Sequence, residues 1–203
     1  MPKSPFHGKD FSSWKKITLK LIDKHPIKAK EIVDTVLKSW DDIFQSKIGS
    51  FNIGKEIFPS PQILSFLLHE LVAHYLSLKY PEIYKVGKIK HEKDIHCITD
   101  ASLSVEIKAS SDPRKIYANR SYAQPATAKG QKIKDGYYIT INFQKFAANS
   151  TDLPKILLIR FGYLEHTDWR PQPAATGQQA TLPPGVYLSK LITIYDYSKE
   201  RGR

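Results

Sequence analysis

The sequence is poor in several features that would assign it to well-known classes of protein. Its single cysteine, Cys97, leaves no internal disulfide and no second thiol for a zinc cluster. No apolar run approaches the ~20 residues needed to span a bilayer, and the N-terminal stretch MPKSPFHGKDFSSW lacks the apolar core of a signal peptide. We therefore expect a soluble protein of the reducing cytoplasm, with no membrane partner.

Acidic residues are scarce relative to basic ones. The chain has 20 Asp and Glu against 31 Lys and Arg, a formal net charge of +11. A charge of this size attracts polyanions and steers their approach. It predicts nucleic acid as the leading partner and an anionic membrane surface as the second, although solubility alone would also account for it.

At 203 residues the chain fits one sizeable core, so we expect a single domain over 1–203. After an irregular start, the apolar spacing predicts a helix within 26–49 that stops at Gly49. A second helix is predicted within 60–81, with Ser60 as N-cap. Its surface is apolar nearly all round, which indicates a buried helix.

Five runs rich in β-branched and aromatic residues follow, at 94–99, 103–109, 136–143, 155–164 and 186–195. Helices followed by strands predict an α/β fold with a central mixed sheet of about five strands flanked by helices. The helical part covers about 1–80, and the sheet with its loops covers about 85–197. Two polar loops, 111–134 and 165–184, are long enough to suggest a functional role.

The stretch HELVAH in the second helix is similar to a zinc-protease motif but has the wrong spacing. His69 and His74 are five residues apart, which at ~100° per residue turns them roughly 140° away from each other. They cannot share one ion on a regular helix. Glu70 between them needs a cation, a donor or a metal if it is buried; a surface position beside a lysine is the alternative.

Two strands in DIHCITDASLSVEIKAS carry the most reactive set of side chains. Alternate residues of a strand share a face, so Glu106 and Lys108 point together, away from Val105 and Ile107. With a turn centred on Ala101, Asp94 lies opposite Lys108. Asp94 and Glu106 are then diagonal neighbours, within roughly 7 to 8 Å.

The same register decides the roles of two further residues. It places His96 opposite Glu106 as a residue supporting the site, and it places Asp100 in the turn, far from Glu106. Two carboxylates and a lysine on one face suit phosphodiester hydrolysis, because hard oxygen ligands hold Mg²⁺ and a lysine can orient the attacking water. A solvated cross-strand ladder of salt bridges is the alternative.

These residues resemble the signature of the PD-(D/E)xK nuclease superfamily, with Lys93 in place of the proline. SPQILSFLLHEL, KDIHCITDASLSVEIKAS, NRSYAQ and HTDWRPQPAATGQQA are similar to segments of the ScaI-like type II restriction endonucleases, over roughly residues 55 to 195. The resemblance implies a prokaryotic, homodimeric, Mg²⁺-dependent nuclease that cuts both strands of palindromic DNA, with a methyltransferase that protects host DNA. It implies Asp94, Glu106 and Lys108 as the catalytic residues and Glu70 as an additional metal ligand.

The two long loops are predicted to contact DNA. Basic and polar groups in the first, which starts just after the catalytic strand, can hold phosphates and base edges: Arg114, Asn119, Arg120, Ser121, Tyr122, Gln124 and Lys129. The second is rich in groups that pair with guanine or adenine: Arg170, Gln172, Gln178 and Gln179, with Trp169 as a packing or stacking partner. Solvated connections are the alternative for both loops.

Two other functions remain open at this point. A repair or junction nuclease on the same fold would recognise DNA shape and produce no discrete fragments. A basic DNA-binding protein without enzymatic activity would leave DNA uncut with Mg²⁺, although acids clustered beside a lysine argue against it because they repel phosphate unless a metal intervenes.

Overall fold

The computed structural model describes residues 4–126, 131–147, 152–174 and 176–200. Its centre is a six-stranded sheet in the order β11-β8-β7-β5-β4-β3. The strands are β3 (Tyr84–Val86), β4 (Ile95–Cys97), β5 (Val105–Ser110), β7 (Gly136–Phe143), β8 (Ile156–Leu164) and β11 (Leu191–Asp196). Only β5 and β7 pair in parallel among these neighbours, so the predicted mixed sheet is confirmed, with β3 as an edge strand that was not predicted.

Three helices precede the sheet: α1 (Phe11–Lys24), α2 (Ala29–Gln45) and α3 (Pro61–Lys79). The interpretation of the first 25 residues as irregular was wrong, because Asp10 caps α1 by accepting a hydrogen bond from the Ser12 amide. Gly49 does not stop α2. It has φ of 62° in the turn between the short strands β1 (Lys47–Ile48) and β2 (Phe51–Asn52), a conformation that glycine adopts without strain.

Helix α3 is buried on one side only. Leu64, Leu68, Val72 and Leu76 recur every fourth residue and are fully buried, which places them on the face that packs on the protein core. Ile63, Phe66 and Leu78 are 52%, 60% and 73% exposed, so the prediction of burial all round was wrong. Within the described ranges, no helix combines the length and apolar character needed to cross a membrane.

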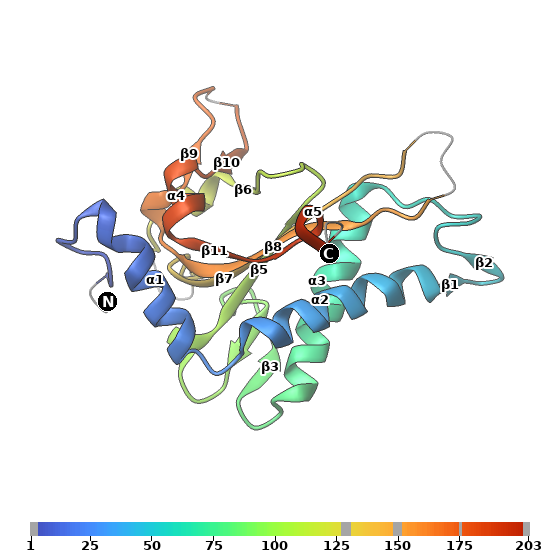
Figure 1. Ribbon diagram of the computed structural model, residues 1–203, viewed down its shortest axis with the longest axis horizontal. Coiled ribbons are helices and arrows are strands. Elements are labelled where there is room, and N and C mark those ends of the chain that lie inside the picture. Colours follow the sequence, from blue (N-terminus) through green and yellow to red (C-terminus); the bar gives the residue numbers. More distant parts are fainter. Residues whose placement is uncertain (1–3, 127–130, 148–151, 175, 201–203) are drawn as a thin grey trace.

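The main sheet separates two apolar clusters. Strand β7 is buried along its whole length; Ile139 and Ile141 belong to the cluster formed with α2 and α3, whereas Tyr138 belongs to a second cluster on the opposite face. Figure 1 shows β6, β9, β10 and α4 together on the side of the sheet away from α2. Because alternate side chains of β7 point to opposite faces, this one strand contributes to the apolar packing on both sides of the sheet.

The second layer is built from the two segments predicted as loops. Strand β10 (Gln179–Thr181) pairs with β6 (Tyr117–Asn119) on one side and β9 (Arg170–Pro171) on the other, so segments about 60 residues apart form one small sheet. The run predicted as a strand over 186–195 is divided between helix α4 (Pro184–Ser189) and β11. Val186 and Leu191, one from each element, both lie in the second apolar cluster.

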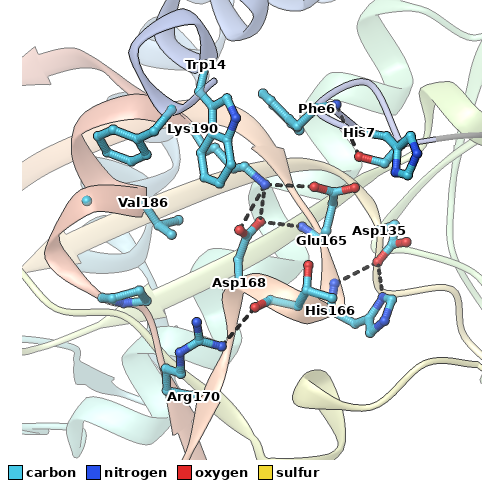
Figure 2. Close-up of a pocket in the computed structure, with 15 residues that line it drawn as sticks. Phe6, His7, Trp14, Asp135, Glu165, His166, Asp168, Arg170, Val186 and Lys190 are labelled. Atoms are coloured by element: carbon cyan, nitrogen blue, oxygen red, sulfur yellow. Dashed lines mark hydrogen bonds and ion pairs between the residues drawn. The ribbon is translucent and has the colours of Figure 1, made fainter. Parts of the chain in front are cut away.

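A buried group of charges fixes the end of β8 to the N-terminal segment. The Lys190 ammonium lies 2.7 Å from Glu165 Oε2 and 2.9 Å from Asp168 Oδ1, with the rings of Phe6 and Trp14 at 4.1 and 4.4 Å (Figure 2). Beside it, a pocket of about 610 Å³ is lined by residues of the N-terminal segment and of 165–170. The pocket contains none of the residues predicted to be catalytic.

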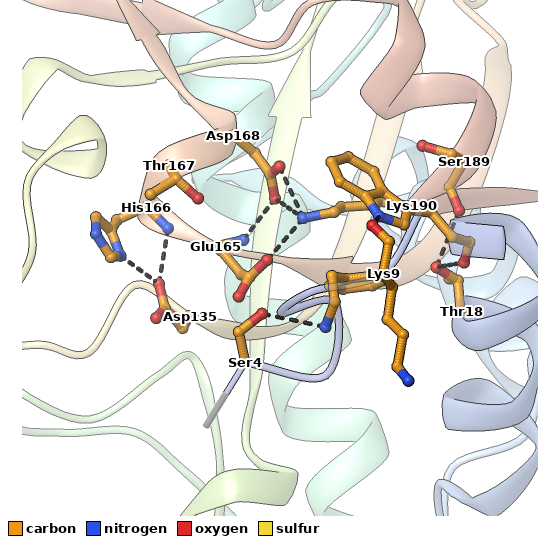
Figure 3. Close-up of polar contacts among 12 residues, drawn as sticks. Ser4, Lys9, Thr18, Asp135, Glu165, His166, Thr167, Asp168, Ser189 and Lys190 are labelled. Carbon is orange, nitrogen blue, oxygen red and sulfur yellow. Dashed lines mark hydrogen bonds and ion pairs between the residues drawn. The ribbon is translucent and has the colours of Figure 1, made fainter. Parts of the chain in front are cut away.

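The backbone next to Lys190 continues this connection to α1. The Thr18 hydroxyl donates a hydrogen bond to the Ser189 carbonyl at 2.9 Å (Figure 3). Burial raises the pKa of Asp168, and the Lys190 ammonium opposes that rise. Lys190 is therefore the cation on which two buried carboxylates depend.

Replacing Lys190 with methionine should lower the free energy of unfolding by about 3 kcal/mol, because Glu165 and Asp168 lose their buried counter-ion. Urea denaturation followed by circular dichroism measures the change. Lys30→Met is the matched control: Lys30 pairs with Asp34 at 2.6 Å but its side chain is 83% exposed, so stability should stay the same within error. Equal effects of the two substitutions would contradict the role of Lys190.

Candidate active site

In the hairpin formed by β4 and β5, Asp94 and Glu106 lie on the same face of the sheet as predicted, but the register of the two strands differs. Ile95 pairs with Val105, which places Asp94 directly opposite Glu106. The predicted pairing of Asp94 with Lys108 was wrong by two residues. The physical reason lies in the turn: Ala101–Leu103 form a 3₁₀ helix, and the Cys97 amide donates to Ser104 Oγ at 3.0 Å, so the ladder ends earlier than a simple turn would allow.

This register changes two assignments made from sequence. His96 does not face Glu106; it pairs with Lys85 of β3, and its Nε2 lies 3.7 Å from Glu92 Oε1. Asp100 is a turn-former as predicted, since it accepts a hydrogen bond from the Ser102 amide at 2.9 Å and is exposed. Residues that lie directly opposite each other in two paired strands point to the same face, so Asp94 and Glu106 are still on the same side of the sheet.

Glu106 is the buried centre of a group of polar side chains. Its side chain is 2% exposed; Lys108 Nζ lies 2.7 Å from Oε1 and Lys132 Nζ lies 2.7 Å from Oε2. The Tyr122 hydroxyl also donates to Oε1. Asp94 completes the group: Oδ2 accepts from the Ile107 amide at 2.7 Å, and Oδ1 lies 3.7 Å from Lys132 Nζ.

The lysines decide the ionisation of Glu106. Burial by itself would raise the pKa of this carboxyl, but the nearby ammonium groups of Lys108 and Lys132 lower it well below its usual range. Burial, assisted by the charge of Glu106, raises the pKa of Tyr122, so the phenol remains a hydrogen-bond donor. Glu106 is therefore an anion at neutral pH, as a metal ligand must be.

Helix α3 presents His69 toward this group. His69 interacts electrostatically with Asp94, Glu106, Lys108 and Lys132, and burial lowers its pKa. Within the described part of the chain, its buried Nε2 has no hydrogen-bond partner. Glu70, one residue later, is 51% exposed, and its Oε2 lies 4.0 Å from His74 Nε2. The role of Glu70 as a metal ligand stays a prediction, while His69 is the residue of α3 that sequence reasoning missed.

Two further lysines at the site come from the loop 111–134, which was predicted to hold phosphates and not to contact the acidic residues. Lys132 contacts both carboxylates, and Lys134 Nζ lies 4.6 Å from the centre of the Tyr122 ring. The density of lysines in KGQKIK, directly before the buried strand β7, was the available signal. Only the fold could show which of these lysines points to the carboxylates, because residues 111–134 have no regular apolar pattern that would predict the direction of each side chain.

Lys93, which directly precedes Asp94, is a buried lysine beside the site. It is 7% exposed, and its ammonium donates to the Asp135 carbonyl at 2.8 Å. Burial lowers its pKa to about 8. Gly136 has φ of 135°, and a Cβ there would lie 2.2 Å from Lys93 Nζ, so the glycine leaves the space that this lysine fills.

The donor set fits a magnesium ion. Two carboxylates, Asp94 and Glu106, face each other and contact the same ammonium, so their oxygens converge within reach of one cation. Magnesium often binds one or two protein carboxylates and keeps several waters. Over the ranges that the structure describes, no group of three or more His, Cys, Asp or Glu side chains is arranged to hold a metal. Two carboxylates are donors that suit a hydrated Mg²⁺, whereas a closed zinc site takes four protein ligands.

Most of the predicted DNA-contacting residues are exposed on the second layer or near it. These are Arg114, Asn119, Ser121, Gln124, Arg170, Gln172, Gln178 and Gln179. Lys129 lies outside the described residues. Tyr122 and Trp169 are 7% and 1% exposed, and their ring centroids are 5.6 Å apart. Trp169 is thus a packing residue, and Tyr122 contacts Glu106 where we expected a contact to bases.

Arg120 joins the two loops. Its Nη1 donates to the carbonyls of Gln172, Ala174 and Gly177 at 3.3, 2.8 and 3.0 Å. The Arg120 amide also donates to the Gln178 carbonyl at 2.7 Å. The Arg120 guanidinium therefore holds the backbone of the segment that carries the three glutamines. This role differs from the direct contact to a base that was predicted for Arg120.

A groove of about 940 Å³ runs along the second layer. It is lined by residues of α4, of β8 and β11, and of the segment after β5. Four of these carry positive charge: Arg114, Lys115, Arg160 and Arg170. Two of the arginines predicted to contact DNA, Arg114 and Arg170, therefore line the same groove, which suits a phosphate backbone.

The chain is similar to restriction enzymes over nearly its whole length. The family model for the ScaI restriction endonuclease matches residues 4–195. The type II restriction enzyme ScaI from Streptomyces caespitosus is 40% identical over 193 residues, which cover 95% of this chain and 85% of that protein. No solved structure matches the chain. The matched range includes the hairpin of β4 and β5, α3 and both segments of the second layer.

The lowered pKa of Glu106 predicts a pH dependence of stability. Because the folded pKa lies below the unfolded value of 4.5, the carboxylate stabilises the fold above pH 4.5, and this contribution is lost as the pH falls below it, by about 1.4 kcal/mol per pH unit. Glu106→Gln lacks this contribution. The difference in unfolding free energy between wild type and Glu106→Gln should therefore shrink from pH 5 to pH 3, measured by urea denaturation in metal-free buffer.

The same substitution at Glu82, which is exposed, is the control for this measurement and should leave the wild-type pH curve in place. A Glu106→Gln protein that runs parallel to wild type across this range would show that the two lysines do not hold the carboxylate ionised.

Proposed function

This chain belongs to the ScaI restriction endonuclease family, and from that premise we propose that Asp94 and Glu106 bind a Mg²⁺ ion while Lys108 assists the attacking water. Membership makes the protein a type II restriction endonuclease, a site-specific deoxyribonuclease that acts on double-stranded DNA. Enzymes of this type generally need a divalent metal. The observation that carries the proposal is the opposition of the two carboxylates across β4 and β5, with Lys108 on the same strand face.

The proposed roles follow from the hydrogen bonds of each residue. The Ile107 amide holds Asp94 Oδ2, so Oδ1 would be the oxygen available to a cation. Tyr122 and Lys108 hold Glu106 Oε1, so Oε2 would be the oxygen that binds the metal. When bound, Mg²⁺ supplies polarisation of the scissile phosphate and neutralisation of its charge.

Lys108 is suited to act on the water and the phosphate. Its side chain is 14% exposed, and its ammonium donates to Glu106 Oε1 and, at 3.1 Å, to the Ile107 carbonyl. A fixed ammonium at this position can orient an attacking water and stabilise negative charge that develops on the phosphate. Because Glu106 and Lys108 are fixed on one short strand, their relative position costs no rearrangement during the reaction.

DNA recognition is assigned to the second layer. Arg114 contacts phosphate along the groove, and the exposed side chains of Arg170, Gln172, Gln178 and Gln179 contact base edges. A homodimer with two-fold symmetry would present this set twice to a palindromic site. A methyltransferase of the same specificity would protect host DNA.

We expect Glu106→Ala and Lys108→Ala to retain DNA binding and to lose cleavage by at least about 10³-fold, because each removes a group that acts on the reacting atoms. Gel-shift assays without metal measure binding, and nicking of supercoiled plasmid with Mg²⁺ measures cleavage. Asp100→Asn is the control: Asp100 is exposed in the turn, so its activity should stay close to wild type. A fully active Lys108→Ala protein would remove Lys108 from the mechanism.

Digestion of a fully sequenced DNA should give discrete fragments whose ends map to one short palindrome. Chelation with EDTA should stop the reaction and added Mg²⁺ should restore it, because the carboxylate pair needs a cation to approach phosphate. Fragments with scattered ends would indicate recognition of DNA shape. Undiminished cleavage in EDTA would overturn the metal assignment.

A further inference from the structure

Lys132 is the one lysine with ion pairs to both acidic residues of the site, among the residues that the structure describes. Its ammonium lies 2.7 Å from Glu106 Oε2 and 3.7 Å from Asp94 Oδ1. It comes from neither of the two catalytic strands; it lies in the irregular segment that leads into β7. Its side chain is 17% exposed, so the contact is formed at the edge of the protein interior.

We propose that the Lys132 ammonium is a built-in competitor of the metal, which occupies the position between Asp94 and Glu106 and has to withdraw before Mg²⁺ binds. The inference rests on the proposed function, because it takes Asp94 and Glu106 as the metal ligands. It adds a regulatory role for a residue outside the Asp94, Glu106 and Lys108 set.

The competition follows from the charges at the site. A carboxylate as buried as Glu106 needs a counter-ion, and Lys108 is bonded to Oε1 alone. Lys132 provides the counter-ion for Oε2, the oxygen that the proposed mechanism assigns to the metal. Two cations at contact distance from this oxygen repel each other strongly, because little water screens their charges. The ammonium and the metal are therefore alternatives.

DNA offers Lys132 a different partner. A phosphate brought to the site is an anion that this lysine can contact once it leaves Glu106. If DNA draws Lys132 away, DNA raises the affinity for Mg²⁺, and by linkage Mg²⁺ raises the affinity for DNA by the same factor. The free enzyme would then hold metal weakly and the DNA complex would hold it tightly.

Calorimetric titration of Mg²⁺ into the DNA-free protein, at one pH and ionic strength, tests this proposal. Lys132→Met should bind Mg²⁺ about tenfold more tightly than wild type, because the competitor is gone. Lys134→Met is the matched control: the Lys134 ammonium lies over the Tyr122 ring, 4.6 Å from its centre, whereas Lys132 is the lysine at contact distance from Glu106 Oε2. The effect of Lys134→Met should therefore stay within about threefold. Glu106→Gln should lose binding.

Each outcome has a distinct meaning. The inference is overturned if Lys132→Met binds Mg²⁺ no more tightly than wild type, or no more tightly than Lys134→Met. In that case, loss of Mg²⁺ binding in Glu106→Gln would still support the proposed metal site. Glu106→Gln that binds like wild type overturns the metal site itself and the inference with it.

A second measurement on the wild-type chain avoids any folding defect of the variants. Lysines labelled by ¹³C reductive methylation give separate NMR signals, and Lys132→Arg and Lys134→Arg identify two of them. The Lys132 signal should move on addition of Mg²⁺ far more than the Lys134 signal. A Lys132 signal that stays in place at saturating Mg²⁺ would show that the ammonium does not withdraw.

Discussion

The structure depends on one constraint, the burial of the Glu106 carboxylate in a central strand. Glu106 is 2% exposed on β5, which lies between β4 and β7. A buried anion is stable only with counter-ions and hydrogen bonds around it, and here Lys108, Lys132 and Tyr122 provide them. These three come from β5, from the segment before β7 and from the second layer, so the need to satisfy one carboxylate brings three parts of the chain to one point.

The second layer is connected to Glu106 by direct packing. Tyr122 donates to Glu106 through its hydroxyl while its ring packs against Trp169, which belongs to the other loop. Trp169 in turn packs on Tyr138 of β7, the strand beside β5. The segments that carry Gln172, Gln178 and Gln179 are thus part of one apolar cluster with Tyr122, the residue that donates to Glu106. A displacement of either segment would reach Glu106 through the contact between Trp169 and Tyr122.

Family membership removes one of the functions that composition and charge left open. A basic protein that binds DNA without cutting it is excluded, since the chain matches type II restriction endonucleases from residue 4 to residue 195. The geometry explains how a chain of net charge +11 can carry two acids side by side at the proposed site of DNA cleavage. Each acid contacts an ammonium in the protein, so the site does not present bare negative charge to the DNA.

The sequence by itself determined the class of fold, the strands β5, β7 and β8, and the presence of Asp94, Glu106 and Lys108 on one face, because periodicity and strand parity are local properties of the chain. It could not predict the register of the hairpin, which the 3₁₀ turn at Ala101–Leu103 sets. Nor could it predict that His69 and Lys132 approach the acids, or that Arg120 binds the backbone of the other loop. These contacts join segments far apart in the chain, and only the packing of the two layers on the sheet decided which side chains meet.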